Sequence, residues 1–313
     1  MMFSGFLLIL FLFFLNVYGF NDNRVINGVQ APSDKYLNVV KIYSIQPKTE
    51  KSESKLVICT GTIISKRYIL TAAHCVTYTD PETGKILTVP IFKIDIRPED
   101  PVKNVWKPDA VAVVAIYHQE YDSGFFGDIA ILKVLEDITD IEPVLLAKDY
   151  VARKNDTGIN VGYGDMDPDV TKSDDPDTLM EINIPILSKQ ECKYSGKYKL
   201  DVICAGTKTT RSDHGDSGGP LFFTSDNGKQ YEVGIAHALV NADGTRHDDK
   251  IQPDFATYTS VSAFCPWIEE VTNNEVHCVE MRRRNEPLAQ NGAMSKNIFI
   301  ILFVYVFNIV LAF

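Results

Sequence analysis

Short runs of β-branched and aromatic residues, separated by turn-forming residues, recur through the body of this 313-residue sequence. Such runs predict β-strands, because branched and aromatic side chains pack well on a pleated surface. A series of strands without intervening helices favours an antiparallel barrel or sandwich, and the spacing accommodates two barrels of similar size. One helix is predicted near residues 261–271, with Trp267 and Ile268 facing the body. The predicted strands span residues 39–45, 56–64, 67–73, 91–96, 110–117, 128–134 and 232–240.

The charge pattern disfavours nucleic-acid binding. The net charge is −10, and an acidic surface without a basic stripe repels phosphate. The segment at residues 165–177 contains six aspartates and is interpreted as a solvated loop. An acidic exosite for basic substrates is the alternative, whereas the aspartate spacing does not fit a calcium-binding EF-hand loop. No cofactor is expected.

The N-terminus has the pattern of a secretory signal peptide at residues 1–19. Its apolar run at residues 6–15 is too short to span a bilayer, and small or modest residues follow at Val17 and Gly19. An uncleaved signal anchor is the alternative, because no Lys or Arg precedes the apolar run. The expected location is secreted or extracellular.

The C-terminus ends in a hydrophobic tail at residues 298–313, after a polar linker at residues 281–297. Three arginines at residues 282–284 lie on what would be the outer side of a membrane span, which favours a processed tail. Small residues at 291–293 resemble the attachment region of a GPI signal, although the spacer is shorter than the usual 8 to 12 or so residues. A GPI tether and a membrane span both remain open.

Six cysteines in a chain with a secretory signal predict three disulfides, because the secretory compartment is oxidising. No pair has CxxC spacing, and no Cys/His cluster is present in the sequence, so no metal site is predicted. The tripeptide at residues 155–157 makes Asn155 a predicted glycosylation site.

Three separate motifs supply the groups that activate a serine nucleophile. They are ILTAAHC with His74, GDIAIL with Asp128, and HGDSGGP with Ser217. A serine hydroxyl needs a base to remove its proton, and that base needs a buried carboxylate to hold its tautomer. Glycines around Ser217 let the amides of Gly215 and Ser217 point into one hollow, where they could stabilise an oxyanion.

Over most of residues 25–271, the sequence resembles the trypsin/chymotrypsin-like serine peptidases, the S1 family. The motifs occur in that family's order of His, Asp, Ser, and further landmarks are GYG, INIPILSKQEC and ICAG. The resemblance implies an all-β domain at residues 25–280, with two antiparallel six-stranded β-barrels and a C-terminal helix. It also implies that His74 is the general base, Asp128 its orienting carboxylate and Ser217 the nucleophile, with Gly215 and Ser217 as oxyanion hole.

The segment RVINGV resembles the family's activation site. By likeness, a trypsin-like protease cuts after Arg24 and removes a propeptide at residues 20–24. The new ammonium of Val25 then pairs with Asp216 and holds the oxyanion loop in its competent shape. The alternative for Arg24 is an exposed basic residue in a frayed terminus.

The resemblance also implies disulfides. Cys59 and Cys75 match the bridge beside the catalytic histidine, and Cys192 and Cys204 match a bridge of the second barrel. Cys265 and Cys278 remain by elimination as a third pair. In one continuous helix these two would lie about 20 Å apart, so a bend must intervene for them to bond.

The substrate pocket departs from the family pattern. Asp213 stands where many members have a cysteine, and the partner cysteine is absent too. His237, Ala238 and Leu239 occupy the places of the usual SWG, so Leu239 would narrow the pocket mouth and His237 would lie beside Asp128.

Arg211 stands where trypsin has an aspartate at the base of its pocket. A buried arginine there would reject substrate Lys or Arg. Two alternatives remain open. Arg211 could accept a substrate Asp or Glu, or it could turn toward Asp213 and leave a pocket for small or apolar side chains.

Two functions fit this sequence. The first is a secreted or surface-tethered serine endopeptidase, made as a zymogen, acting as a monomer on protein or peptide substrates. The second is a catalytically silent homologue that binds a partner through its cleft. Labelling of Ser217 by a fluorophosphonate would discriminate between them.

Overall fold

The computed structural model describes residues 28–48, 53–89, 92–96, 109–122, 126–164, 178–192, 202–245 and 253–281. The expected signal peptide, the activation site at Arg24 and Val25, the aspartate-rich loop and the hydrophobic tail lie outside the described residues. Within these ranges, no helix is long and apolar enough to cross a membrane.

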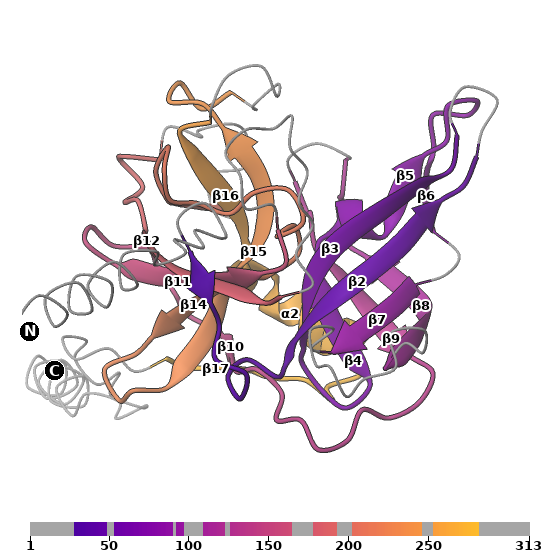
Figure 1. Cartoon of the computed structure of the whole chain (residues 1–313), viewed down its shortest axis with the longest axis horizontal. Coiled ribbons are helices and arrows are strands. Elements are labelled where there is room, and N and C mark those ends of the chain that lie inside the picture. Colours follow the sequence, from indigo (N-terminus) through magenta and orange to yellow (C-terminus); the bar gives the residue numbers. More distant parts are fainter. Residues whose placement is uncertain are drawn as a thin grey trace, which may run out of the picture. The chain divides into compact units, whose positions relative to one another are not determined.

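The first half of the domain is a closed six-stranded barrel of antiparallel pairs, in the order β2-β3-β4-β9-β8-β7 (Figure 1). Side chains in these strands alternate between the barrel interior and the outside; in β7, Phe92 and Ile94 are buried while Lys93 is not. This alternation fixes the register, because a slip of one residue would expose the buried set. The strands are β2 (Val39–Gln46), β3 (Lys55–Ile63), β4 (Tyr68–Thr71), β7 (Phe92–Ile96), β8 (Ala110–Tyr117) and β9 (Ala130–Val134).

The second half is also built from six antiparallel strands, which pair in the order β12-β11-β14-β15-β16-β13. An isolated antiparallel bridge between Ile186 and Ala205 closes this series. The predicted all-β architecture of two antiparallel barrels is therefore confirmed. The strands are β11 (Thr157–Gly162), β12 (Met180–Pro185), β13 (Val202–Ala205), β14 (Pro220–Thr224), β15 (Gln230–Val240) and β16 (Phe255–Ser260).

Five short strands extend these barrels. Strand β1 pairs with β12, and β5 forms a hairpin with β6. Strand β10 pairs in parallel with both β15 and β17, so the second sheet is not wholly antiparallel. The short strands are β1 (Val29–Gln30), β5 (Thr77–Thr79), β6 (Ile86–Thr88), β10 (Leu146–Ala147) and β17 (Cys278–Val279).

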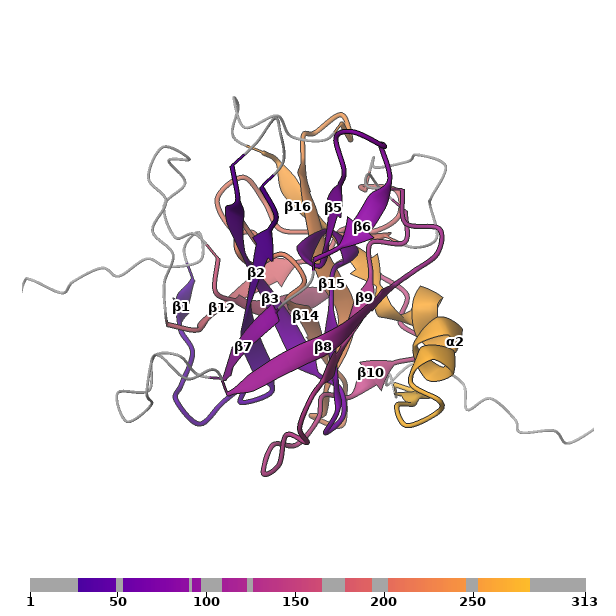
Figure 2. The same cartoon turned by 90° about the vertical axis from the view of Figure 1, so that its right-hand side faces the viewer.

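The predicted C-terminal helix is confirmed as α2 (Val261–Val271), shown in Figure 2. Trp267 and Ile268 are buried, as expected for the face that packs on the body. After the helix, Asn273 and Asn274 adopt positive φ angles and turn the chain back. This turn supplies the bend that allows Cys265 and Cys278 to form a disulfide, with Cα atoms 5.8 Å apart.

The C-terminal helix and part of the second barrel pack against the core of the first barrel, while the second barrel also has a separate buried cluster of its own. Ile235 of β15 and Phe264 of α2 belong to the same buried cluster as the side chains of the first barrel. Two further disulfides, Cys59–Cys75 and Cys192–Cys204, each lie within one barrel. The junction between the barrels is therefore a packed interface, and the candidate site is built across it.

All seven strands predicted from the sequence are present, with ends shifted by up to two residues. The prediction missed the other described strands, including most of the second barrel. In β11, for example, Asn160 is fully buried and bonds to Tyr258 and Asp216. Asn160 interrupts the apolar pattern of the strand. Its partners are distant in the sequence, so its burial could not be predicted from the strand alone.

Candidate active site

His74 lies in a single 3-10 turn, η2 (Ala73–Cys75), that follows β4. Ala73 and Cys75 are buried on either side of it, and the disulfide to Cys59 ties the turn to β3. The His74 side chain itself is 34% exposed. Its backbone is therefore held rigidly while its ring remains accessible.

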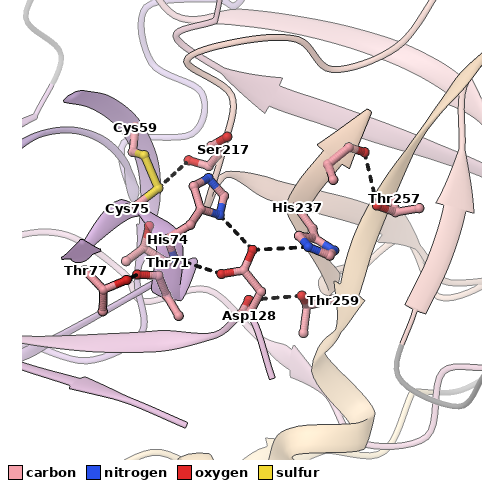
Figure 3. Close-up of polar contacts among 12 residues, drawn as sticks. Cys59, Thr71, His74, Cys75, Thr77, Asp128, Ser217, His237, Thr257 and Thr259 are labelled. Carbon is pink, nitrogen blue, oxygen red and sulfur yellow. Dashed lines mark hydrogen bonds and ion pairs between the residues drawn. A yellow bond between two sulfur atoms is a disulfide. The ribbon is translucent and has the colours of Figure 1, made fainter. Parts of the chain in front are cut away.

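Asp128 orients the His74 ring (Figure 3). Its Oδ2 lies 2.7 Å from His74 Nδ1, and its Oδ1 accepts a hydrogen bond from the His74 backbone N–H at 2.9 Å. Burial alone would raise the pKa of Asp128, but the charge and hydrogen bonds of His74, together with the charge of His237, lower it to about 2. The ionised Asp128 accepts a hydrogen bond from His74 Nδ1, which orients the ring so that Nε2 lies away from this carboxylate.

Ser217 lies in a tight loop whose backbone conformation requires glycine at position 215. Gly215 has a φ of 94°, and a Cβ atom there would lie 2.8 Å from the Cα of Gly164. The Thr60 hydroxyl donates to the carbonyl of Gly215 at 2.9 Å, and the Thr60 N–H donates to the carbonyl of Ser217 at 2.9 Å. The first barrel therefore fixes the loop that the second barrel presents.

The backbone N–H groups of Gly215 and Ser217 donate to no acceptor within the described part of the chain, whereas the neighbouring N–H of Gly218 donates to the carbonyl of Ala236. Figure 3 draws the His74 ring between Asp128 and Ser217. The described residues include no hydrogen bond from Ser217 Oγ to His74. Catalytic hydrogen bonds are often long before substrate binds, so the lack of this bond does not argue against a Ser217–His74 pair.

Asp216 is a fully buried carboxylate beside the serine. It accepts hydrogen bonds from the N–H groups of Gly164 and Asp213, both at 2.9 Å, and from Asn160 Nδ2 at 3.4 Å. Burial, which outweighs these bonds, raises its pKa to about 7. No cation of the described residues pairs with Asp216. Among the described residues it is therefore a buried acid that is surrounded by hydrogen-bond donors and has no counter-charge.

Arg211 adopts the orientation in which it turns toward Asp213. Its Nη2 lies 3.0 Å from Asp213 Oδ2, its Nη1 donates to the carbonyl of Lys208, and its side chain is 1% exposed. Burial alone would raise the pKa of Asp213, but hydrogen bonds from His214 and the charge of Arg211 lower it. The arginine charge is therefore balanced inside the protein.

Strand β15 carries His237, Ala238 and Leu239, the three residues predicted at the places of SWG. The His237 side chain is 3% exposed, and its Nε2 lies 3.5 Å from Asp128 Oδ2. Ala238 pairs with Thr257, and Leu239 pairs with Ala256, on the adjacent strand β16. The structure thus brings His237 to the His74–Asp128 pair and leaves Ala238 and Leu239 along the strand.

Cys59, His74 and Cys75 offer three atoms within 4.8 Å of one another that have the chemistry of metal ligands. Both sulfur atoms are joined to each other in a disulfide. A disulfide sulfur is not a thiolate, which is the form that binds metal. This cluster does not fit a metal site.

One buried acid was missed by sequence reasoning. Glu232 of β15 is fully buried; its Oε2 accepts a hydrogen bond from Thr62 Oγ1 at 2.7 Å, and its Oε1 has no hydrogen-bond partner among the described residues. Burial raises the pKa of Glu232 to about 8. The sequence contained a signal for this buried acid, because Glu232 begins the mostly apolar run at residues 232–240.

A buried Asp oriented toward an accessible His on one barrel, with a serine in a glycine loop on the other, defines the class of trypsin-like serine peptidase folds. The family comparison agrees with this class, since the family model described as Trypsin matches residues 38–268. The chain belongs to the trypsin family. A solved structure titled "Structure of GrC" is also similar: the TM-score is 0.59 and the identity 21%, over 79% of this chain and 98% of that one. At this identity the likeness shows the shared fold.

Proposed function

We propose that the chain is a serine endopeptidase that hydrolyses peptide bonds through an acyl-enzyme. The observation that carries this proposal is the 2.7 Å contact between His74 Nδ1 and the buried Asp128 carboxylate, beside a serine loop with two unused N–H groups. A hydrolase of this type needs a base, an orienting carboxylate, a nucleophile and oxyanion donors. We assign these roles to His74, Asp128, Ser217 and the N–H groups of Gly215 and Ser217.

In the proposed mechanism, Ser217 Oγ attacks the substrate carbonyl carbon and transfers its proton to His74 Nε2. Asp128 stabilises the resulting imidazolium, and the N–H groups of Gly215 and Ser217 stabilise the oxyanion. The tetrahedral intermediate collapses when His74 donates its proton to the leaving amine. Water then attacks the acyl-enzyme, again with His74 as the base, and restores the free serine.

We also propose that the chain is a zymogen cut after Arg24 by a trypsin-like protease. The uncompensated carboxylate of Asp216 supports this proposal, because a buried acid of this kind is stabilised by an incoming cation. The new ammonium of Val25 would provide that charge.

For location, we propose an extracellular protein with a cleaved signal peptide and a C-terminal GPI tether. The three disulfides support an oxidising compartment. The test is treatment of cells with a phosphoinositide-specific phospholipase C. Release of the protein would support the tether, and retention would contradict it.

The proposed substrates are proteins cleaved after small or apolar residues. Arg211 and Asp213 neutralise each other, so the pocket base has no free charge for a charged side chain. The test is digestion of a peptide library by protein cleaved at Arg24, with Ser217→Ala as the matched control. Cleavage after small or apolar residues supports the proposal. Cleavage after Lys or Arg contradicts the pocket assignment, and no cleavage favours the binding module.

A further inference from the structure

His237 is placed next to Asp128 by an irregularity in strand β15. Ala236 pairs with Tyr258, and Ala238 pairs with Thr257, so His237 is an extra residue between two consecutive positions of β16. A bulge of this kind redirects a side chain and is common beside active sites. The buried His237 ring consequently points at the Asp128 carboxylate (Figure 3).

Two imidazoles share one carboxylate oxygen. Asp128 Oδ2 lies 2.7 Å from His74 Nδ1 and 3.5 Å from His237 Nε2. A third segment reaches the same residue, because Thr259 Oγ1 donates to the Asp128 backbone carbonyl at 3.0 Å. Asp128 is therefore held from η2, from β15 and from β16.

The contact from His237 is longer than the N–H···O distance of about 2.9 Å that is typical of a hydrogen bond. It is an electrostatic contact between an imidazole and an anion that is 2% exposed, where little water screens it. Without it, among the described residues only His74 would contact the carboxylate oxygens, through its backbone N–H at Oδ1 and its Nδ1 at Oδ2. Oδ2 would then be less constrained, and the Nδ1 contact of His74 would lengthen.

We propose that His237 is a positioning residue that holds the Asp128 carboxylate toward His74. This inference rests on the proposed peptidase function and deepens it. The sequence predicts His237 both among the pocket residues and beside Asp128, and the proposal assigns its role to the contact with Asp128. A pocket residue acts on substrate binding and selectivity, whereas a residue that acts through Asp128 affects the chemical step.

The test compares His237→Ala with His237→Gln in the activated protein. Alanine removes the imidazole that residue 237 presents to Asp128, whereas glutamine retains an N–H donor of similar reach. We expect His237→Ala to lower kcat about tenfold at unchanged KM, and His237→Gln to restore kcat to within about threefold of the parent. Unfolding temperatures establish that both variants fold. Thr257→Val, which removes a bond to the Ala238 carbonyl in the same bulge without touching Asp128, is the matched structural control.

A second readout does not require turnover. The proton shared by His74 Nδ1 and Asp128 gives a low-field proton NMR signal that exchanges with water when the contact loosens. We expect a sharp signal in the parent and in His237→Gln, and a broadened or lost signal in His237→Ala, with Thr257→Val unchanged.

The proposal is overturned if His237→Ala keeps the parent kcat and signal, or if its effect falls on KM alone. It is also overturned if glutamine rescues neither readout in a folded variant. Failure of the parent to react with a fluorophosphonate would refute the peptidase function instead, and the NMR comparison would still decide the role of His237.

Discussion

Arg211 Nη2 lies 3.0 Å from Asp213 Oδ2, and the two side chains are only 1% and 6% exposed. Removing one partner of such a buried pair leaves an uncompensated charge, which costs about 3 to 5 kcal/mol, whereas removing both charges together can be nearly neutral. The pair links Arg211, which the family resemblance predicts at the base of the substrate pocket, to the loop that precedes Ser217.

The first prediction follows from this pair. Arg211→Met and Asp213→Asn should each lower the free energy of unfolding by about 3 kcal/mol. The double variant should be more stable than either single variant, because no buried charge is left unpaired. Denaturant unfolding at constant pH measures the three values. Strictly additive losses would show that the two residues are not coupled.

The second prediction concerns Glu232. Its pKa is raised from 4.5 to about 8 in the folded protein, so between these values the folded state binds a proton that the unfolded state lacks. The stability contributed by the protonated acid is therefore present at low pH and is lost as the pH rises toward 8. Relative to the parent, Glu232→Gln should gain about 1.4 kcal/mol of unfolding free energy per pH unit over this window.

Unfolding curves of the parent and of Glu232→Gln at several values from pH 5 to pH 9 check this expectation. The difference between the two proteins should grow up to about pH 8 and then level off. Thr62→Val, which removes the hydroxyl that donates to Glu232, is the control. Because that hydrogen bond lowers the pKa of Glu232, the Thr62→Val protein should lose stability over a wider pH range than the parent. Parallel curves would mean that Glu232 is already solvated or paired.

The third prediction is that Asp216→Asn stabilises the uncleaved protein but inactivates the cleaved protein. The pKa of Asp216 is raised to about 7 in the uncleaved chain, so its favourable protonated state is lost as the pH rises from about 4 through 7. At pH 8, Asp216→Asn should stabilise the uncleaved protein by about 3 kcal/mol. After cleavage at Arg24, the same variant should lose nearly all peptidase activity, because the Val25 ammonium has no carboxylate to bind.

Thermal unfolding of the uncleaved proteins and peptide cleavage by the cut proteins supply the two halves of this comparison. An uncleavable Arg24→Gln protein provides the inactive reference. Equal activity of cleaved Asp216→Asn and cleaved parent would exclude the proposed activation mechanism.

The fourth prediction concerns Asn155, an exposed residue in a turn with a φ of 71°. A glycan there would extend into solvent, so protein made in a secretory host should shift in mobility after treatment with an N-glycosidase. Thr157→Val removes the acceptor motif and leaves the turn conformation of Asn155 intact. Its product should not shift. An unchanged mobility of the parent would count against glycosylation at this position.

The catalytic motifs could be found in the sequence because their chemistry requires particular residues next to one another. The glycines flanking Ser217 and the cysteine after His74 are local requirements of a tight loop and a braced turn. The apolar strands of the first barrel were likewise visible, because their side-chain pattern reports burial directly. The C-terminal helix followed from the same reasoning.

The side-chain directions could not be read in this way. The orientation of Arg211 depends on the carboxylate of Asp213 and the carbonyl of Lys208 in the folded loop. The direction of His237 depends on a bulge, which arises from the pairing of β15 with β16. Both are properties of tertiary structure, so the sequence placed these residues near the site without fixing what they contact.

The most direct test of the account is covalent labelling of Ser217. The protein is cleaved after Arg24, treated with a fluorophosphonate, and digested for mass spectrometry, with His74→Ala and Ser217→Ala as controls. We expect stoichiometric modification of Ser217 in the parent, slow modification in His74→Ala and none in Ser217→Ala. An unmodified Ser217 in the cleaved, folded parent would contradict the central claim that His74 and Asp128 activate this serine.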